Sequence, residues 1–539
     1  MPCARRLSIT ALLVSCAFSA YPQPGIAQKT RIGPPFYSGA IQPAPRHAQY
    51  GQRHAPVAVF REGKPVINLD CADFGPAAPL ARRLIERRLE QYAGQAAPTE
   101  TLPEPTPIRM GLASDLLPWE TARLPEQGYF LDVSVDGIVC AGADNAGTLN
   151  AVASLLQLTQ VRNGILVARC GQFRDWPTFT TRYISEYHVP GPDFFDWMMS
   201  EKINGFAASY RAMDWRGHSD ARRNTLKTVG EYVRGYGTLR FMAQFHIGGR
   251  QGVVLDCGDP EQVETLCQTV LETVRLAAAR HIMVCYDDVD PQLQPQEREL
   301  FANPAEAHGA AVRQVHNAVK AVSPETIVSF CPPYYQGRGH RRWRGEKQRE
   351  KGLAYLRQVG KWAGDEIPVV WTGPVTESKR ITEEDIASYR KWLGGGARLF
   401  YWDNTWHYHQ PLRNFHAVYA EGFVKHCANR ESYVNINATK PIGRFFAVTA
   451  NAYYWNPAGF DAERAWRHAV ARFMGPEAVE AAAEFYTLRG DSYYVTFKRD
   501  VDLQAFREVV GKLEARSLDD ALPAVVRAGY ESVAAQRKR

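Results

Sequence analysis

Two adjacent aspartates, Asp287 and Asp288, directly follow an apolar run in the stretch HIMVCYDDVDP. Carboxylates this close cannot both ionise freely, so one pKa should rise, and a carboxylic acid with a raised pKa can protonate a leaving oxygen. Ordinary retaining glycosidases hold two carboxylates about 5 Å apart across the scissile bond, which neighbouring residues suit poorly. Adjacent carboxylates better suit the exceptional mechanism in which the substrate's own acetamido oxygen is the nucleophile. One carboxylate then holds the amide N–H, and the other is the general acid and base. The plainer alternative is a solvated acidic loop or a helix N-cap.

The aspartate pair lies within a regular alternation of short apolar runs and helix-like segments. The runs occupy residues 182–185, 205–208, 240–245, 282–286, 326–330, 369–371, 398–401 and 433–436. Short strands that alternate with helices in this way predict an α/β fold, a (β/α)8 TIM barrel, over residues 176–440. Catalytic groups of such barrels lie at the carboxyl ends of the strands, which is where the aspartate pair falls.

Polar, aromatic and acidic side chains follow the other runs, as expected of a binding cleft and not of a packed cap. We expect the cleft to be lined by residues at or just beyond the strand ends, namely Arg211, Cys331, Tyr335, Trp371, Asp403, Asn404, His409 and Asn437. Asp403, His407 and His409 match a metal site only weakly, and aromatic-rich sugar clefts often hold such histidines. We therefore expect no metal and no cofactor.

Three further regions surround the predicted barrel. Residues 28–55 are rich in Pro, Gly, Gln and His without periodicity and indicate a linker. Residues 56–175 contain strand-like and helix-like segments in the order of a small α+β domain. Residues 441–539 have a helical pattern and predict a C-terminal helical domain.

The first residues have the pattern of a secretory signal, with Arg5 and Arg6 before a short apolar stretch and small residues. We expect residues 1–27 to be a signal peptide that is cleaved near Ala27, which predicts an exported protein, periplasmic or extracellular. A competing prediction is a bacterial lipobox, LVSC, which would leave a lipid anchor on Cys16. No later apolar run approaches about 18 residues, so we expect no transmembrane helix.

Charge and cysteine usage exclude some other classes of protein. The 64 basic and 57 acidic residues give a net charge of +7 without an arginine-rich arm or basic stripe, so we expect no nucleic-acid partner. The ten cysteines are scattered without a C-x-x-C pair, which argues against a structural zinc site or thioredoxin chemistry.

The motifs VCYDDVDP, FCPPYYQG, VVWTGPVTESKRIT and YWDNTWHYHQ resemble, in this order and spacing, glycoside hydrolase family 84. This is the family of O-GlcNAcases and bacterial β-N-acetylglucosaminidases, and the resemblance covers about residues 180–450. The preceding stretch GYFLDVSVDGIVCAGADNAGTLNAVASLLQL resembles the small α/β domain that precedes the barrel in families 20 and 84. The resemblance implies neighbouring-group catalysis through an oxazoline intermediate on a carbohydrate substrate.

The resemblance also implies roles for individual residues. Asp287 would orient and polarise the acetamido group, and Asp288 would be the general acid and then the general base. Tyr335 would hydrogen-bond the acetamido oxygen, Cys331 would line the methyl pocket, and the sugar would be bound by Asn404 and Asn437.

The chain departs from the family pattern where the other sugar hydroxyls are held. The family's EGFYG is SEYHVPG here, its lysine after the second strand is replaced by Arg211, and its acid beyond the WDN motif is His409. The sugar and linkage therefore stay open. Two alternatives also remain: another glycoside hydrolase, such as a family 20-like hexosaminidase, and a non-catalytic sugar-binding barrel. Family 20 places Asp-Glu at this strand end, and a pure binder needs no general acid, so the aspartate pair argues against both.

Overall fold

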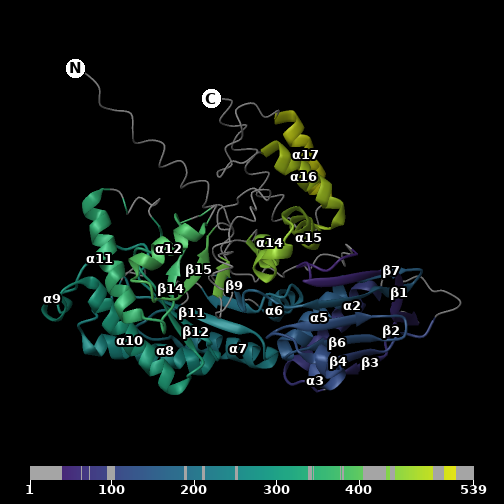
Figure 1. Cartoon of the computed structure of the whole chain (residues 1–539), viewed down its shortest axis with the longest axis horizontal. Coiled ribbons are helices and arrows are strands. Elements are labelled where there is room, and N and C mark those ends of the chain that lie inside the picture. The colour runs from purple at the N-terminus through teal and green to yellow at the C-terminus, as the bar shows by residue number, and fades with distance from the viewer. Residues whose placement is uncertain are drawn as a thin grey trace.

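The computed structural model describes residues 39–516, apart from 62–63, 72, 94–102, 187–190, 209–212, 249–252, 338–342, 344, 377, 379–380, 405–432, 437–442 and 490–502. Three parts follow one another along the chain: a sheet domain, a barrel and a group of helices (Figure 1). No helix within the described ranges is both long and apolar enough to cross a membrane. The predicted signal peptide, 1–27, and Cys16 lie outside these ranges.

The N-terminal domain is a mixed sheet with helices packed on it. Its strands are β1 (His47–Arg61), β2 (Lys64–Val66), β3 (Leu69–Cys71), β4 (Ile108–Leu112), β5 (Tyr129–Val133), β6 (Ile138–Gly142), β7 (Thr159–Arg162) and β8 (Ile165–Asp175). The strand order is β2-β1-β8-β5-β6-β4-β3, and β7 pairs with β8. The helices are α2 (Ala77–Ala93), α3 (Ala113–Leu116), α4 (Trp119–Ala122) and α5 (Asn145–Gln157).

The predicted linker, 28–55, is wrong from His47 onward, because residues 47–55 form the first part of β1. This part pairs antiparallel with β8, interrupted by a register shift between Tyr50 and His54. Its backbone hydrogen bonds come from β8, while several of its side chains are exposed and carry no alternating apolar pattern. The pairing could therefore not be seen in the side-chain pattern.

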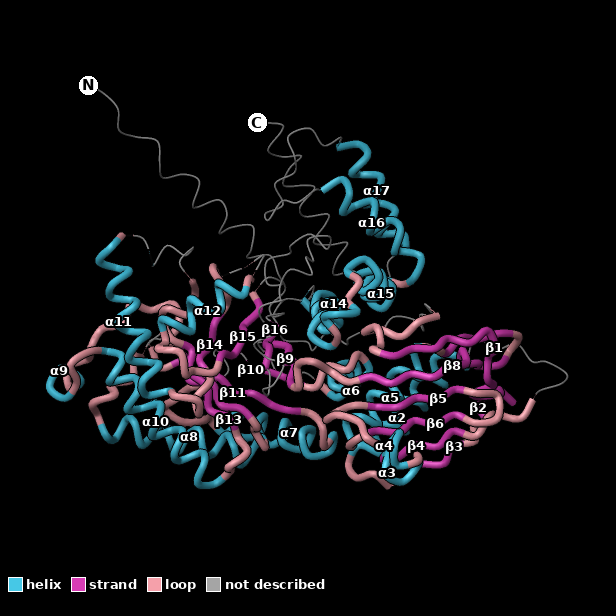
Figure 2. Tube along the Cα trace, viewed as in Figure 1, coloured by secondary structure: helices cyan, strands magenta, loops and turns pink. Residues whose placement is uncertain are grey.

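The second part is a closed barrel of parallel strands in the order β10-β11-β12-β13-β14-β15-β16-β9 (Figure 2). The strands are β9 (Thr181–Glu186), β10 (Gly205–Ala208), β11 (Arg240–His246), β12 (His281–Cys285), β13 (Ile327–Cys331), β14 (Val369–Trp371), β15 (Leu399–Asp403) and β16 (Tyr433–Ile436). Each coincides with one of the eight apolar runs, which confirms the predicted barrel. Both faces of such a strand are buried, so its sequence is a short continuous apolar run.

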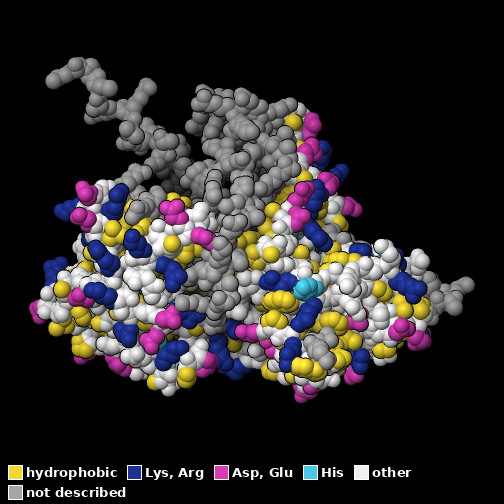
Figure 3. All heavy atoms as spheres, viewed as in Figure 1, with side chains coloured by type: hydrophobic (Ala, Val, Ile, Leu, Met, Phe, Trp, Pro, Cys, Tyr) yellow, Lys and Arg dark blue, Asp and Glu magenta, His cyan; other side chains and the backbone are white. Residues whose placement is uncertain are grey.

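Helices surround the barrel and form the C-terminal part. The barrel helices are α6 (Pro192–Ser200), α7 (Asp220–Tyr236), α8 (Pro260–Ala277), α9 (Glu297–Leu300), α10 (Pro304–Val322), α11 (Glu346–Ala363) and α12 (Glu383–Trp392). The C-terminal helices are α14 (Gly443–Trp455), α15 (Ala462–Met474), α16 (Val479–Arg489) and α17 (Leu503–Arg516). On the face drawn in Figure 3, basic and acidic side chains are interspersed over the described surface.

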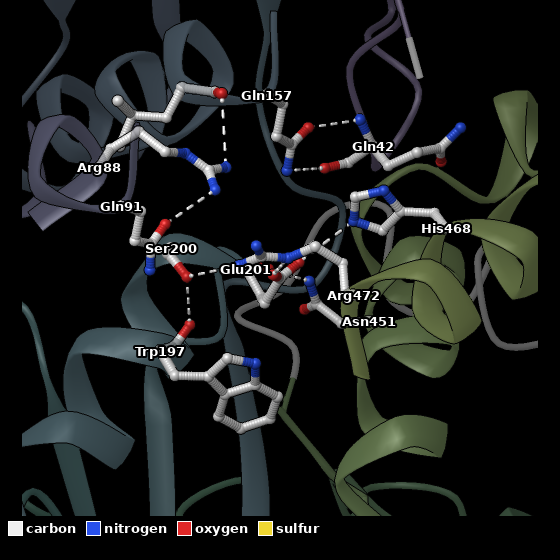
Figure 4. Close-up of polar contacts among 11 residues, drawn as sticks. Gln42, Arg88, Gln91, Gln157, Trp197, Ser200, Glu201, Asn451, His468 and Arg472 are labelled. Carbon is white, nitrogen blue, oxygen red and sulfur yellow. Dashed lines mark hydrogen bonds and ion pairs between the residues drawn. The ribbon is translucent and has the colours of Figure 1, made fainter. Parts of the chain in front are cut away.

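A buried ion pair joins the C-terminal helices to the barrel (Figure 4). Arg472 Nε on α15 lies 2.6 Å from a carboxylate oxygen of Glu201, which follows α6, and His468 Nε2 lies 3.4 Å from the other oxygen. Asn451 Nδ2 on α14 donates to the Glu201 carbonyl at 2.8 Å. Burial alone would raise the pKa of Glu201, but Arg472 and His468 lower it to about 2. Glu201 therefore stays ionised and binds two C-terminal helices to the barrel.

The sheet domain contacts the same side of the barrel through α2. Arg83 and Arg87 on this helix contact the buried carboxylate of Asp196 on α6, at 2.8 and 2.7 Å. Helix α6 and the residue that follows it, Glu201, thus make ion pairs to both neighbouring parts of the chain. These contacts hold one side of the barrel.

Candidate active site

The aspartate pair continues the inward-facing row of β12. Met283 and Cys285 belong to the buried apolar cluster that fills this part of the barrel. Because side chains alternate along a strand, Asp287 continues their row just beyond the strand end. Its side chain is 17% exposed. The row therefore runs from a packed interior to a carboxylate that a ligand can reach.

Asp287 contacts His246, the last residue of the neighbouring strand β11. His246 Nε2 lies 3.2 Å from Oδ1 of Asp287 and 2.9 Å from its backbone oxygen. The strand register accounts for this contact, because His246 pairs with Cys285, two residues before Asp287. The imidazole is fully buried, so the contact fixes one side of the aspartate pair.

Asp288 is held from the opposite side, by Tyr335 in the segment after β13. The Tyr335 hydroxyl donates to Oδ1 of Asp288 at 2.8 Å. Asp288 has a φ of +60°, in the left-handed region that Asp adopts more readily than most residues. Burial, and then the charges of Asp288 and Asp287, raise the pKa of Tyr335, so the phenol stays protonated and can donate. The two carboxylates thus have partners on opposite neighbouring strands, as expected of adjacent side chains that diverge.

Tyr335 belongs to a buried apolar cluster inside the barrel, which we call the floor of the site. Cys331 ends β13 in register with Cys285 of β12, and both belong to the same buried cluster as Tyr335 and Val370. The Cys331 side chain is small and 6% exposed. Such a floor next to two carboxylates can accept a small apolar group of a ligand whose polar atoms face the acids.

Asn404 follows β15 and is fixed by two hydrogen bonds. Its Oδ1 accepts from Trp402 Nε1 at 2.9 Å, and its Nδ2 donates to the Thr376 carbonyl at 3.1 Å. Trp402 packs against the interior cluster of the barrel. Asn404 therefore lies at the same end of the barrel as the aspartate pair, with an amide that is held in place.

The structure places Asp403 and Trp371 elsewhere than the predicted cleft. Asp403 is fully buried and accepts from the Tyr454 hydroxyl on α14 at 2.5 Å. Trp371 is 1% exposed and stacks on Tyr389 of α12, with ring centroids 5.3 Å apart. Both lie between the strands and the outer helices, because adjacent residues in a strand face opposite sides and their neighbours face inward. Their prediction as cleft residues is corrected accordingly.

The remaining predicted residues lie outside the described part of the chain, namely Arg211, His409 and Asn437. Within the described part, no three His, Cys, Asp or Glu side chains are arranged to hold a metal ion.

Two side chains at this end of the barrel were not singled out from the sequence, His246 and Trp402. Both lie at the end of a predicted strand, and this position was the one feature of the sequence that could have indicated a place in the site. The sequence does not show which neighbouring side chain each one contacts, because that depends on the register between strands.

Comparisons with families of known proteins match both the barrel and the sheet domain. A family model described as beta-N-acetylglucosaminidase matches residues 210–487, more than half of the chain. A model described as glycosyl hydrolase family 20, domain 2, matches residues 39–176. The second match begins at residue 39, within the predicted linker, in agreement with the position of β1.

Among curated proteins, the O-GlcNAcases of Mus musculus and Rattus norvegicus are each 29% identical over 153 residues. The matched stretch is 28% of this chain and 15% of each relative, so it spans a small part of their length. The solved structure of CpGH84B has a TM-score of 0.64 at 16% identity and covers 91% of this chain and 89% of its own. That of CpGH84D has a TM-score of 0.61 at 13% identity, covering 91% and 86%. At these identities the two structures show a common fold.

Proposed function

Since the chain belongs to the β-N-acetylglucosaminidase family, glycoside hydrolase family 84, we propose that it hydrolyses β-linked N-acetylhexosaminides by substrate-assisted catalysis. The family description and the O-GlcNAcase relatives favour N-acetylglucosamine as the sugar. The catalytic residues of the proposal are Asp287 and Asp288.

One observation carries this proposal: the two adjacent carboxylates contact different partners, next to the apolar cluster that contains Cys331 and Tyr335. Asp287 is held by His246 and Asp288 by Tyr335, at 3.2 and 2.8 Å. Two carboxylates on adjacent residues at one strand end can reach two points on the same face of a ligand. They cannot easily reach opposite faces of a sugar ring. This arrangement suits a substrate that supplies its own nucleophile, with two carboxylates in different supporting roles.

In the proposed first step, the Asp287 carboxylate accepts a hydrogen bond from the N–H of the acetamido group, which makes the acetamido oxygen a better nucleophile. That oxygen bonds to the anomeric carbon as the bond to the leaving oxygen breaks, and Asp288 gives its proton to the leaving oxygen. In the second step, the Asp288 carboxylate takes a proton from water as this water attacks the anomeric carbon. The bond between this carbon and the acetamido oxygen breaks, and the acetamide re-forms with its N–H still hydrogen-bonded to Asp287. Two inversions leave the product in the β configuration.

Selection for an N-acetyl group would come from the floor of the site. The methyl of the acetamido group would rest on Cys331, while its N–H meets Asp287. A sugar with a hydroxyl in place of the acetamido group has neither the nucleophile nor the methyl. We therefore expect it to be unreactive and not merely a weaker binder.

The test is hydrolysis of an aryl β-N-acetylglucosaminide and of the matching β-glucoside and β-N-acetylgalactosaminide. Asp287→Asn and Asp288→Asn should each lose about 10²–10⁴-fold in kcat/KM, with Asp288→Asn less impaired on an activated leaving group. Asp290→Asn is the control, because Asp290 is 64% exposed and pairs with Lys351 at 3.3 Å. Sugar binding without turnover would instead support the non-catalytic alternative, and full activity of both variants would overturn the assignment.

We also propose that the protein is exported. The proposal rests on the basic start, apolar stretch and small residues within residues 1–27. N-terminal sequencing of protein from cell fractions tests it. A mature chain that begins near residue 28 supports cleavage at a signal peptide, an acylated chain that begins at Cys16 supports the lipobox, and an intact Met1 in the cytoplasmic fraction contradicts export.

A further inference from the structure

His246 makes two contacts with Asp287 through a single ring nitrogen. Its Nε2 faces the Oδ1 atom at 3.2 Å and the backbone oxygen of Asp287 at 2.9 Å. Both oxygens belong to groups that accept hydrogen bonds, a carboxylate and a carbonyl. The nitrogen between them must therefore carry a hydrogen, which assigns the Nε2–H form of the imidazole.

We propose that His246 is a positioning residue that holds Asp287 in the orientation needed to accept the acetamido N–H. This inference rests on the proposed function. One N–H fixes both the backbone and the side chain of Asp287, so it sets the position of the residue and the rotation of its carboxylate.

The position of His246 suits this role because the imidazole has little freedom to move. The side chain has no exposed surface, and it ends β11 in register with β12. The contact therefore joins two neighbouring barrel strands at the level of the reaction. Without the N–H of His246, Oδ1 of Asp287 would lose one hydrogen-bond donor. The carboxylate could then rotate away from the acetamido group.

The two aspartates are positioned by different residues. His246 contacts Asp287, and Tyr335 contacts Asp288 from the other side. A defect at His246 should impair attack by the acetamido oxygen and leave protonation of the leaving group intact. The two kinds of defect differ in how they respond to the leaving group, because an activated leaving group needs little protonation.

The experiment compares His246→Gln, His246→Leu and His246→Asn with the wild-type full chain. The amide nitrogen of Gln can replace Nε2, Leu keeps apolar volume without a donor, and Asn keeps an amide that is too short to reach Oδ1. The matched control is His316→Gln, a buried histidine on α10 whose ring contacts Asn317. Substrates are aryl β-N-acetylglucosaminides with one good and one poor leaving group, and thermal unfolding reports on folding.

The Leu and Asn variants should lose about 10- to 100-fold in kcat/KM, by a similar factor with both leaving groups, as expected for loss of a hydrogen bond to a charged group. The Gln variant should recover most of this activity, and the control should match the wild type. If Leu prevents folding, the comparison of Asn with Gln decides.

Three results would overturn the inference: unimpaired Asn or Leu variants, a folded Gln variant as impaired as Asn, or a defect that disappears with the activated leaving group. An inert wild type is a different outcome, because it overturns the proposed function and this inference with it.

Discussion

Replacing Arg472 with Met should destabilise the protein, because it leaves the buried Glu201 carboxylate without its closest charged partner. Arg472 and Glu201 are 6% and 2% exposed and lie 2.6 Å apart. The pKa of Glu201 falls from an ordinary 4.5 to about 2, although burial alone would raise it. At 1.36 kcal/mol per pKa unit, this corresponds to about 3 kcal/mol of stability at neutral pH. The same size, about 3–5 kcal/mol, is typical when one partner of a buried ion pair is removed.

The pH dependence has a definite sign. The folded-state pKa of Glu201 is depressed, so its contribution is fully present above the unfolded pKa of about 4.5 and is lost as the pH falls toward about 2. In Arg472→Met the effect of burial on the pKa of Glu201 is less opposed, so the gap in stability between the wild type and this variant should be largest at neutral pH and narrow as the pH falls.

The assay is chemical denaturation of the wild type, Arg472→Met, Glu201→Gln and the double variant at pH 7 and pH 3.5. Arg467→Met is the matched control, since Arg467 lies on the same helix, is 37% exposed and pairs with Glu463 and Glu480 on the surface. A surface pair of this kind contributes at most about 1 kcal/mol. The double variant should be more stable than Arg472→Met alone. Equal midpoints for Arg472→Met and Arg467→Met would refute the reasoning.

Three further predictions concern the candidate site. Tyr335→Phe keeps the ring on the apolar floor but removes the bond to Asp288, so kcat/KM should fall about 10- to 100-fold with an unchanged unfolding midpoint; unchanged kinetics would contradict the contact. Trp371→Phe should lower the unfolding midpoint without changing KM, because Trp371 stacks on Tyr389 in the outer layer. A raised KM would instead indicate that Trp371 contacts the substrate. Cys331→Met should raise KM for N-acetyl substrates more than Cys331→Ala does, because a longer side chain fills the floor, and equal KM values would remove Cys331 from the pocket.

The barrel could be predicted from the sequence because its strands are buried on both faces, which leaves eight short apolar runs. The aspartate pair could be placed because catalytic groups of such barrels lie at strand ends. Residues 47–55 could not be recognised as a strand, because several of their side chains are exposed and their hydrogen bonds come from β8.

Contacts between residues far apart in the sequence could not be predicted either. The direction of a side chain in a three-residue strand such as β14 follows from its register with neighbours, so Trp371 was assigned to the wrong side. The contact of His246 with Asp287 joins two strands 41 residues apart, and that of Arg472 with Glu201 joins residues 271 apart. Nothing in the local sequence of any of these residues indicates its partner.

The most direct measurement for the central claim is the rate of hydrolysis of aryl β-glucosaminides whose N-acetyl group carries no, one, two or three fluorine atoms. Fluorine withdraws electrons from the acetamido oxygen and makes it a poorer nucleophile. If that oxygen attacks the anomeric carbon with Asp287 and Asp288 in their proposed roles, kcat/KM should fall steeply with each fluorine. A rate that does not depend on fluorination would contradict substrate-assisted catalysis and require a nucleophile from the protein or from water.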